Sequence, residues 1–182
     1  KLEFLFTPQR FGGGMFNFLA MLHQAGVTTA LDMGTGIYGN PVGEIAGVRA
    51  AAQAYPVPVR LILTPIIVDF LARGKTPEEA LAEILAWQTD NDDRVMVGNH
   101  FKLMIDGAIF SGLAQMGPPG YLDGHKGVWM VPETVLRAYS EVFWRAGFQL
   151  HAHANGDAAV DRFLRLIEGL RQDFPRPDHR ST

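Results

Sequence analysis

The sequence predicts an α/β protein built on a parallel sheet, and the main observation behind this fold class is an alternation along the chain. Short apolar and β-branched runs alternate with longer stretches whose apolar residues recur at helical spacing. Strands that alternate with helices in this way favour a parallel sheet with helical crossovers. The expected strands are residues 27–33, 59–63, 95–105 and 148–153, and the expected helices are 15–24, 41–54, 77–88, 132–145 and 158–171.

Local signals set the bounds of these elements. The three glycines Gly12 to Gly14 open the first helix, and Gly26 closes it as the residue after the C-cap. The Ala-rich helix 41–54 stops at Tyr55-Pro56, because proline cannot continue a helix. The clearest start precedes Pro77, where Thr76 is an N-cap and two glutamates follow in the first turn.

Composition fits one soluble globular domain of 182 residues, with 47% hydrophobic and 19% charged residues. A net charge of -3 without any run of basic residues argues against nucleic acid and anionic membranes as partners. No apolar run reaches the length of a membrane span, and no signal peptide is visible. The absence of cysteine excludes disulfides and thiolate metal sites, but it does not settle the compartment; a cytoplasmic location is favoured.

A long Gly- and Pro-rich segment, residues 107–131, follows the third expected strand. Such a long irregular stretch in a compact domain is usually a binding or lid segment, and it leaves the strand end at which parallel α/β proteins place active sites. We therefore expect an active-site loop. A disordered excursion is the alternative, although Tyr121 and Trp129 would be costly to leave in water.

The run Gly34-Thr35-Gly36-Ile37-Tyr38-Gly39 has the spacing of a dinucleotide-binding turn. The match is weak, because Asn40-Pro41 follows the third glycine and no acidic residue ends a strand about 20 positions later. The favoured interpretation is a flexible loop above Asp32 with local hydrogen bonding.

Lys102 lies among apolar strand residues, where a bare ammonium would be expensive to bury. Three explanations fit. Its tip reaches solvent at a strand edge, it forms a Schiff base, or carbon dioxide has carboxylated its amine to an anion that can bridge two metals.

His151 and His153 are two residues apart in an expected strand, so their side chains share a face. His153 lies nearer the C-terminal end of the strand, where a neutral imidazole is well placed to bind a divalent metal. A core histidine with satisfied hydrogen bonds is the alternative for each. Surface or structural roles are expected for the remaining histidines, His23, His100, His125 and His179.

Together these residues resemble the amidohydrolase superfamily, and within it the branch that includes N-substituted formamide deformylases. The resemblance spans most of the chain and rests on ordered motifs, which are Gly26-Val27-Thr28-Thr29, Phe101-Lys102-Leu103-Met104-Ile105-Asp106-Gly107-Ala108, Gly120-Tyr121, Gly127, Gly147-Phe148-Gln149 and His151-Ala152-His153-Ala154-Asn155-Gly156-Asp157-Ala158-Ala159.

The resemblance implies a partial TIM (β/α)8 barrel, about strands 2 to 5, with residues 1–182 as a fragment of a single hydrolase domain. It implies one or two divalent metals, commonly zinc, that activate water to hydrolyse a C–N bond in a small amide-like molecule. Lys102 matches the strand-four lysine that is often carboxylated and bridges the metals, and His153 matches the strand-five histidine ligand. Tyr121, Trp129 and His151 are expected to contact the substrate.

The family's strand-one histidine pair, strand-six histidine and strand-eight general-base aspartate are not identifiable in this sequence. Asn155 and Ala158 depart from the family pattern, which commonly has an aliphatic residue and an arginine at these positions. A complete barrel takes about 250 residues, so half of it is missing.

We therefore expect the isolated chain to be inactive, with its open sheet edges covered by the remainder of the barrel or a second copy. Apolar strand residues are expected to need that cover, namely Leu61, Leu63, Leu103, Ile105 and Leu150. Two alternatives stay open, a Schiff-base barrel aldolase or lyase that uses Lys102 and a non-catalytic fragment that only binds a partner.

Overall fold

The computed structural model describes residues 7–182, and these divide into two compact units. The first unit runs to Pro65 and includes Glu83–Gly98, and the second comprises Ile66–Ala82 and Asn99–Thr182. Each unit contains parallel strands with helices beside them, which confirms the predicted parallel α/β class.

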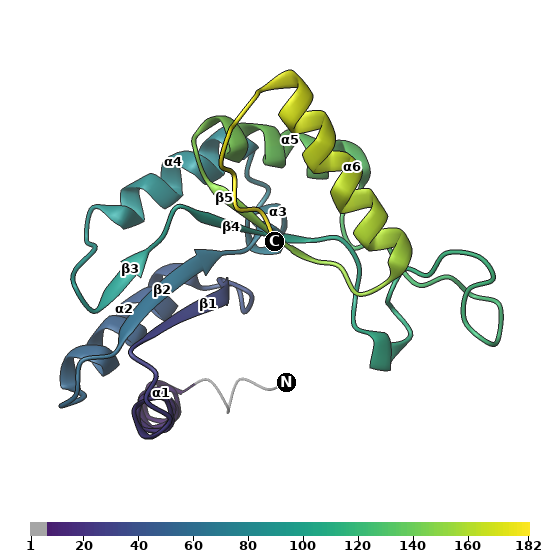
Figure 1. Cartoon of the computed structure of the whole chain (residues 1–182). Coiled ribbons are helices and arrows are strands. Elements are labelled where there is room, and N and C mark those ends of the chain that lie inside the picture. The colour runs from purple at the N-terminus through teal and green to yellow at the C-terminus, as the bar shows by residue number, and fades with distance from the viewer. Residues whose placement is uncertain (1–6) are drawn as a thin grey trace. The chain divides into compact units, whose positions relative to one another are not determined.

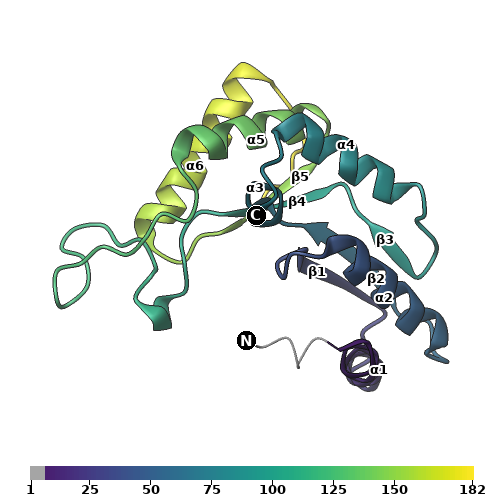
Figure 2. The same ribbon diagram turned by 180° about the vertical axis from the view of Figure 1, so that it is seen from behind.

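The first unit holds a three-stranded parallel sheet in the order β1-β2-β3. Helix α2 packs against strands β1 and β3, and helix α1 packs against α2, as Figure 2 shows. The bounds of these elements are α1 Pro8–Gln24, β1 Thr29–Thr35, α2 Pro41–Ala54, β2 Arg60–Pro65 and β3 Val95–Val97.

Alternation of side chains along these strands builds the core of the first unit. Leu61 and Leu63 of β2 pair in register with Val95 and Val97 of β3, and all four side chains are buried. Since strand residues two apart point to the same face, these four form one apolar surface. Helix α2 adds the buried side chains Ile45, Val48, Ala51 and Ala52.

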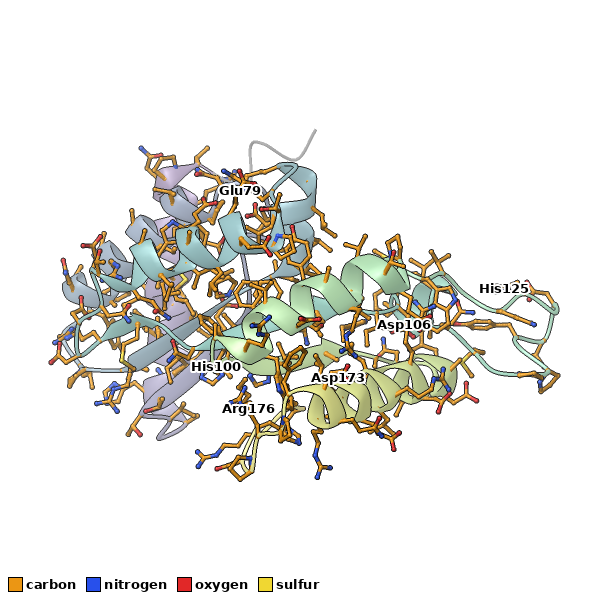
Figure 3. All side chains as sticks on the ribbon, turned by 90° about the horizontal axis from the view of Figure 1, so that it is seen from above. Glu79, His100, Asp106, His125, Asp173 and Arg176 are labelled. Carbon is orange, nitrogen blue, oxygen red and sulfur yellow. The ribbon has the colours of Figure 1, made fainter. Side chains whose placement is uncertain are left out.

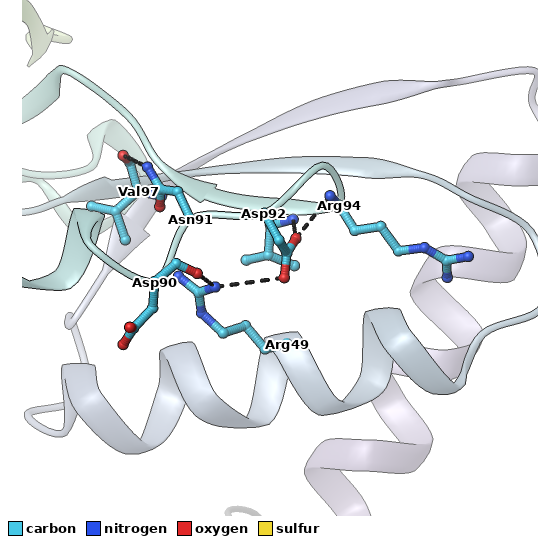
Figure 4. A network of polar contacts seen from close by, with 7 residues as sticks. Arg49, Asp90, Asn91, Asp92, Arg94 and Val97 are labelled. Atoms are coloured by element: carbon cyan, nitrogen blue, oxygen red, sulfur yellow. Dashed lines mark hydrogen bonds and ion pairs between the residues drawn. The ribbon is translucent and has the colours of Figure 1, made fainter.

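Polar side chains before β3 fix where that strand begins (Figure 4). The carboxylate of Asp92 accepts a hydrogen bond from the N–H of Val95 at 2.7 Å and lies 3.6 Å from the guanidinium of Arg49 on α2. The side chain of Asn91 makes two hydrogen bonds to the backbone of Val97. Its Oδ1 accepts from the N–H at 2.7 Å, and its Nδ2 donates to the carbonyl at 3.1 Å. The loop therefore holds both ends of a very short strand.

The second unit holds a two-stranded parallel sheet, β4-β5. A parallel bridge from Ile66 to Lys102 lies on the other edge of β4. Helix α5 packs against β5, and α6 packs against α5 (Figure 1). The bounds are α3 Ile67–Ala72, β4 His100–Met104, the 3-10 helix η2 Ile109–Ser111, α5 Glu133–Arg145, β5 Gln149–His153 and α6 Asp157–Asp173, while α4 Pro77–Gln88 contributes residues to both units.

An aromatic cluster covers one face of this two-stranded sheet. Phe101 of β4 stacks on Phe143 of α5 with ring centroids 3.7 Å apart, and Phe148 meets Phe143 edge-on at 5.1 Å. All three rings are fully buried. The neighbouring Leu103 and Leu150 are also fully buried, so this face packs on the helices and the alternate side chains belong to the other face.

The predicted bounds of helices 41–54 and 77–88 are confirmed. The expected elements 27–33, 59–63, 132–145, 148–153 and 158–171 differ from the structure by one or two residues at an end, and three further features need a larger correction. Helix α1 begins at Pro8, with Thr7 as its N-cap, so the three glycines lie inside the helix. Helix α3 was not predicted. The expected strand 95–105 is two strands, because the chain changes partner at Gly98-Asn99: the N–H of Gly98 bonds to Leu63, whereas the carbonyl of Asn99 accepts from Gln149.

The five leucine and isoleucine side chains expected to need cover from another protein are at most 4% exposed. That prediction is wrong for these residues, because the chain itself already covers their side chains. The five residues in question are Leu61, Leu63, Leu103, Ile105 and Leu150. Separately, none of the helices in residues 7–182 has the length and apolar character to cross a membrane.

The helical glycines give a first prediction. A Cβ added at exposed Gly13 would meet nothing within 4 Å, so Gly13→Ala should raise the free energy of unfolding by about 0.5–1 kcal/mol by reducing the flexibility of the unfolded chain. Denaturant unfolding measures this. Gly26→Ala is the matched control: the space is equally open, but φ is +72°, so a loss of about 1 kcal/mol is expected. Equal destabilisation by both variants would contradict a helix through Gly13.

Candidate metal site on strands β4 and β5

The register of β4 and β5 brings the two predicted ligands to one face. Lys102 pairs with His151, and Met104 pairs with His153. Because side chains alternate along a strand, Lys102, His151 and His153 share the face opposite the aromatic cluster. Their expected arrangement on adjacent parallel strands is confirmed, while their role as metal ligands stays a prediction.

Lys102 is half-buried on β4. Burial lowers the pKa of its amine below the ordinary value. Among residues 7–182, its Nζ has no hydrogen bond or ion pair that would stabilise an ammonium. The nearest titratable neighbour on β5 is His151, whose pKa is affected by the charge of Lys102. Burial thus makes the neutral, nucleophilic amine easier to reach than it is in an exposed lysine.

His151 is the middle of a hydrogen-bonded chain that the sequence did not reveal. Its Nε2 lies 2.9 Å from Nδ1 of His100, and its Nδ1 lies 2.7 Å from Oγ1 of Thr182. Burial, followed by the charges of His100 and Lys102, lowers the pKa of His151 to about 4, so the ring is neutral at pH 7. Both ring nitrogens of the predicted substrate-contacting His151 are therefore engaged within the chain.

Asp106 holds together the two segments that flank the site (Figure 3). It is fully buried two residues after the end of β4, and its Oδ2 accepts hydrogen bonds from the N–H groups of Gln115 and Gly156, both at 2.8 Å. Its Oδ1 accepts from the N–H of Asn155 at 2.9 Å. One carboxylate thus fixes the loop after β4 and the turn after His153. The only sequence signal for this role of Asp106 was its position at the end of an expected strand, before a glycine.

The side chain of Asn155 lies against His153. Its Nδ2 is 3.1 Å from Nε2 of His153 and 3.2 Å from the carbonyl oxygen of Gly107. This contact places a polar group directly on the predicted ligand.

The loop of residues 107–131 is built from internal hydrogen bonds and a tie to α6, where Asp157 accepts from the N–H of Gly117 at 2.7 Å. Tyr121 stacks on His125 with centroids 4.1 Å apart, and Trp129 lies 3.5 Å beneath the guanidinium of Arg162. The ring partners of these two aromatic residues are thus His125 and Arg162. The expected contact of Tyr121 and Trp129 with substrate stays a prediction.

His125 links two parts of the loop, because its ring contacts both Asp123 and Gly112. Its Nδ1 lies 2.5 Å from the carboxylate of Asp123, and its Nε2 lies 2.8 Å from the carbonyl of Gly112. Both nitrogens face acceptors, so only the imidazolium can donate both hydrogen bonds. The bond to Asp123 first, and then the one to Gly112, raise the pKa of His125 above its ordinary value.

This link through His125 predicts a loop that loosens as pH rises. A raised folded pKa means that the stabilisation is complete below about pH 6.5 and is lost as pH rises through the higher folded value. Amide exchange of residues 117–127, corrected for intrinsic rates, should therefore accelerate above that value. His125→Gln, which cannot gain or lose the proton, should abolish the step. A histidine titration that places the pKa of His125 at or below 6.5 would contradict this link.

The glycine-rich run after β1 has no dinucleotide-binding geometry. Asp32 accepts hydrogen bonds from the N–H of Gly34 at 3.1 Å and the hydroxyl of Thr35 at 3.0 Å. Helix α2 begins only after Asn40, whose side chain caps it by accepting from Gly43. The interpretation as a loop with local hydrogen bonds around Asp32 is confirmed.

Within residues 7–182, no three His, Cys, Asp or Glu side chains gather closely enough to hold a metal ion. A groove of about 690 Å³ lies between α5 and α6, and neither Lys102 nor His153 lines it. The chain therefore presents two neighbouring candidate ligands on an open strand face.

Comparison with solved structures gives two relatives of the fold. One is an uncharacterized metal-dependent hydrolase from Pyrococcus furiosus, with a TM-score of 0.66 and 17% identity over 92% of this chain and 33% of that chain. The other is an uncharacterized metal-dependent hydrolase from Pyrococcus horikoshii OT3, with a TM-score of 0.64 and 16% identity over 91% of this chain and 31% of that chain. This chain thus spans about one third of each relative.

At these identities the likeness shows the fold alone, and it confirms the predicted partial α/β barrel. No curated protein matches the sequence. The model of the amidohydrolase family matches residues 5–182, which is nearly the whole chain. This chain therefore belongs to the amidohydrolase family.

Proposed function

We propose that this chain supplies Lys102 and His153 as two ligands of the metal centre in a hydrolase that cleaves C–N bonds of small amide- or formamide-like molecules. The observation that carries the proposal is their placement on one face of adjacent parallel strands. Family membership supports hydrolytic chemistry, and both structural relatives are described as metal-dependent hydrolases.

The donor set suits a divalent cation, with zinc favoured. His153 offers an imidazole, which is a usual zinc ligand. Lys102 has an amine whose pKa is lowered by burial, and the neutral amine is the form that carbon dioxide carboxylates. The resulting carbamate would offer oxygen donors to one or two ions. A catalytic zinc takes about three protein ligands, so other ligands would come from elsewhere in a complete barrel.

The remaining roles follow from the position of the loop. A bound divalent cation supplies Lewis-acid activation of water and of the substrate carbonyl. Residues 107–131 leave the C-terminal end of β4, the end at which barrel enzymes bind substrate, so Tyr121 and Trp129 would line the substrate site together with His151. The general-base aspartate would also come from another part of the barrel.

In this proposal the parent protein is active and the isolated chain is not, because the rest of the barrel or a second copy completes the centre. The expected protein partner is thus the remaining barrel, and the expected ligand is a small molecule.

The lowered pKa of Lys102 also suits a second chemistry, a Schiff base with a carbonyl substrate in an aldolase or lyase. That reaction needs no metal. Trapping with borohydride separates the two, since only a Schiff base would leave the substrate covalently attached to Lys102.

The test is hydrolysis of a panel of N-formyl and N-acyl amines by the parent protein, with and without chelator. Chelation should abolish activity, and zinc should restore it. Lys102→Met and His153→Ala should each lower kcat/KM by at least about 100-fold. Lys75→Met, at a lysine outside the loop and outside β4 and β5, is the matched control and should retain activity. Chelator-resistant hydrolysis, or full activity without Lys102, would overturn the proposal.

A further inference from the structure

Three contacts hold Asn155, one through its backbone N–H and two through Nδ2 of its side-chain amide. Its own backbone N–H donates to Asp106 at 2.9 Å, and its Nδ2 lies 3.2 Å from the carbonyl oxygen of Gly107. The same Nδ2 lies 3.1 Å from Nε2 of His153. Because Asp106 is fully buried and directly precedes Gly107, the backbone groups that hold this amide are themselves well anchored.

These contacts determine which atom of the amide faces the histidine. A carbonyl oxygen can only accept a hydrogen bond, so the group beside Gly107 must be the NH2 of Asn155 and not its oxygen. The NH2 group has two hydrogens, one for Gly107 and one for His153. Nε2 of His153 must then accept, which leaves the ring proton on Nδ1.

We propose that Asn155 is a positioning residue for His153, which caps Nε2, holds the ring in the Nδ1–H tautomer and competes with a divalent cation for the Nε2 lone pair. The tautomer follows from the contacts alone, and the competition rests on the proposed function. An aliphatic side chain at this position would leave Nε2 uncapped.

The first arm of the experiment reads the tautomer directly, without any metal. The full chain carries six histidines, which can be labelled with nitrogen-15 in the ring, and His153→Gln assigns the signal of His153. At about pH 8, above the ordinary imidazole pKa near 6.5, the wild-type spectrum should show a protonated Nδ1 and a bare Nε2. Asn155→Leu, of similar size but without a donor, should shift His153 toward Nε2–H.

Asn155→Asp is the complementary variant. It keeps the size but presents only acceptors, so it should drive His153 to the Nε2–H tautomer more completely than leucine does. A wild-type ring that is mainly Nε2–H, or a tautomer that neither variant changes, would overturn the proposal. Circular dichroism of both variants distinguishes a local change from loss of fold.

The second arm titrates the wild-type chain and Asn155→Leu with zinc and follows the shift of the His153 signal. Removing a competing hydrogen bond should tighten zinc binding about two- to tenfold. Weaker binding by the leucine variant would overturn the competition. Failure of zinc to reach His153 in either protein would count against the proposed metal function, while the tautomer result would still decide the role of Asn155.

Discussion

Asp106→Ala is expected to lower the free energy of unfolding by about 3–5 kcal/mol, because it removes a buried carboxylate that satisfies three backbone donors. The N–H groups of Gln115 and Gly156 lie in buried residues and would be left without a partner. Urea unfolding followed by circular dichroism measures the loss. Amide exchange should show that these two N–H groups lose protection first.

Asp106→Asn is the matched variant, since it keeps the size of the side chain and one acceptor oxygen. Its NH2 group would face a donor, so a smaller loss of about 1.5–3 kcal/mol is expected. If alanine and asparagine both left the unfolding free energy within about 0.5 kcal/mol of wild type, Asp106 would not hold the loop and the turn together.

The polar network around Asp106 matters for the site because it begins two residues after the end of β4 and reaches Asn155 and Gly156, two and three residues after His153. It fixes the turn that carries Asn155 and, through Gln115, the loop of residues 107–131. Weakening it should therefore disturb the ring of His153 as well as global stability.

Much of this architecture could be predicted because the signals are local. Helix α4 begins at Pro77, as predicted from Thr76 as its N-cap. The hydroxyl of Thr76 accepts a hydrogen bond from the N–H of Glu79. The shared face of Lys102 and His153 followed from the period of two in a strand, once both segments were assigned as parallel strands.

The features that could not be predicted depend on contacts between distant parts of the chain. The break at Gly98-Asn99 occurs because the partner strand changes from β2 to β5, which no local pattern encodes. The partner of His151 at Thr182 is 31 residues away. The three glycines Gly12 to Gly14 led to a wrong predicted start for α1. Glycine weakens a helix without forbidding it, and α1 continues through these residues from Pro8 to Gln24.

Gly156→Ala is expected to lower the free energy of unfolding by about 3 kcal/mol, because the new Cβ would collide with the main chain of the loop. It would lie 2.0 Å from the carbonyl oxygen of Gln115 and 2.4 Å from its carbon. Neither partner can move away freely, since Asp106 binds the N–H of both residues. The φ of Gly156 is -81°, so backbone strain is not the cause.

The contrast with Gly13→Ala makes this collision measurable. Both substitutions add one methyl group, yet only the one at Gly156 meets main-chain atoms, so their unfolding free energies should change in opposite directions. The nitrogen-15 signal of His153 should also change in Gly156→Ala, because relief of the collision must move the turn that carries Asn155. Wild-type stability together with an unchanged His153 signal would show that Gln115 does not pack on this turn, and that the loop reaches the site by another route.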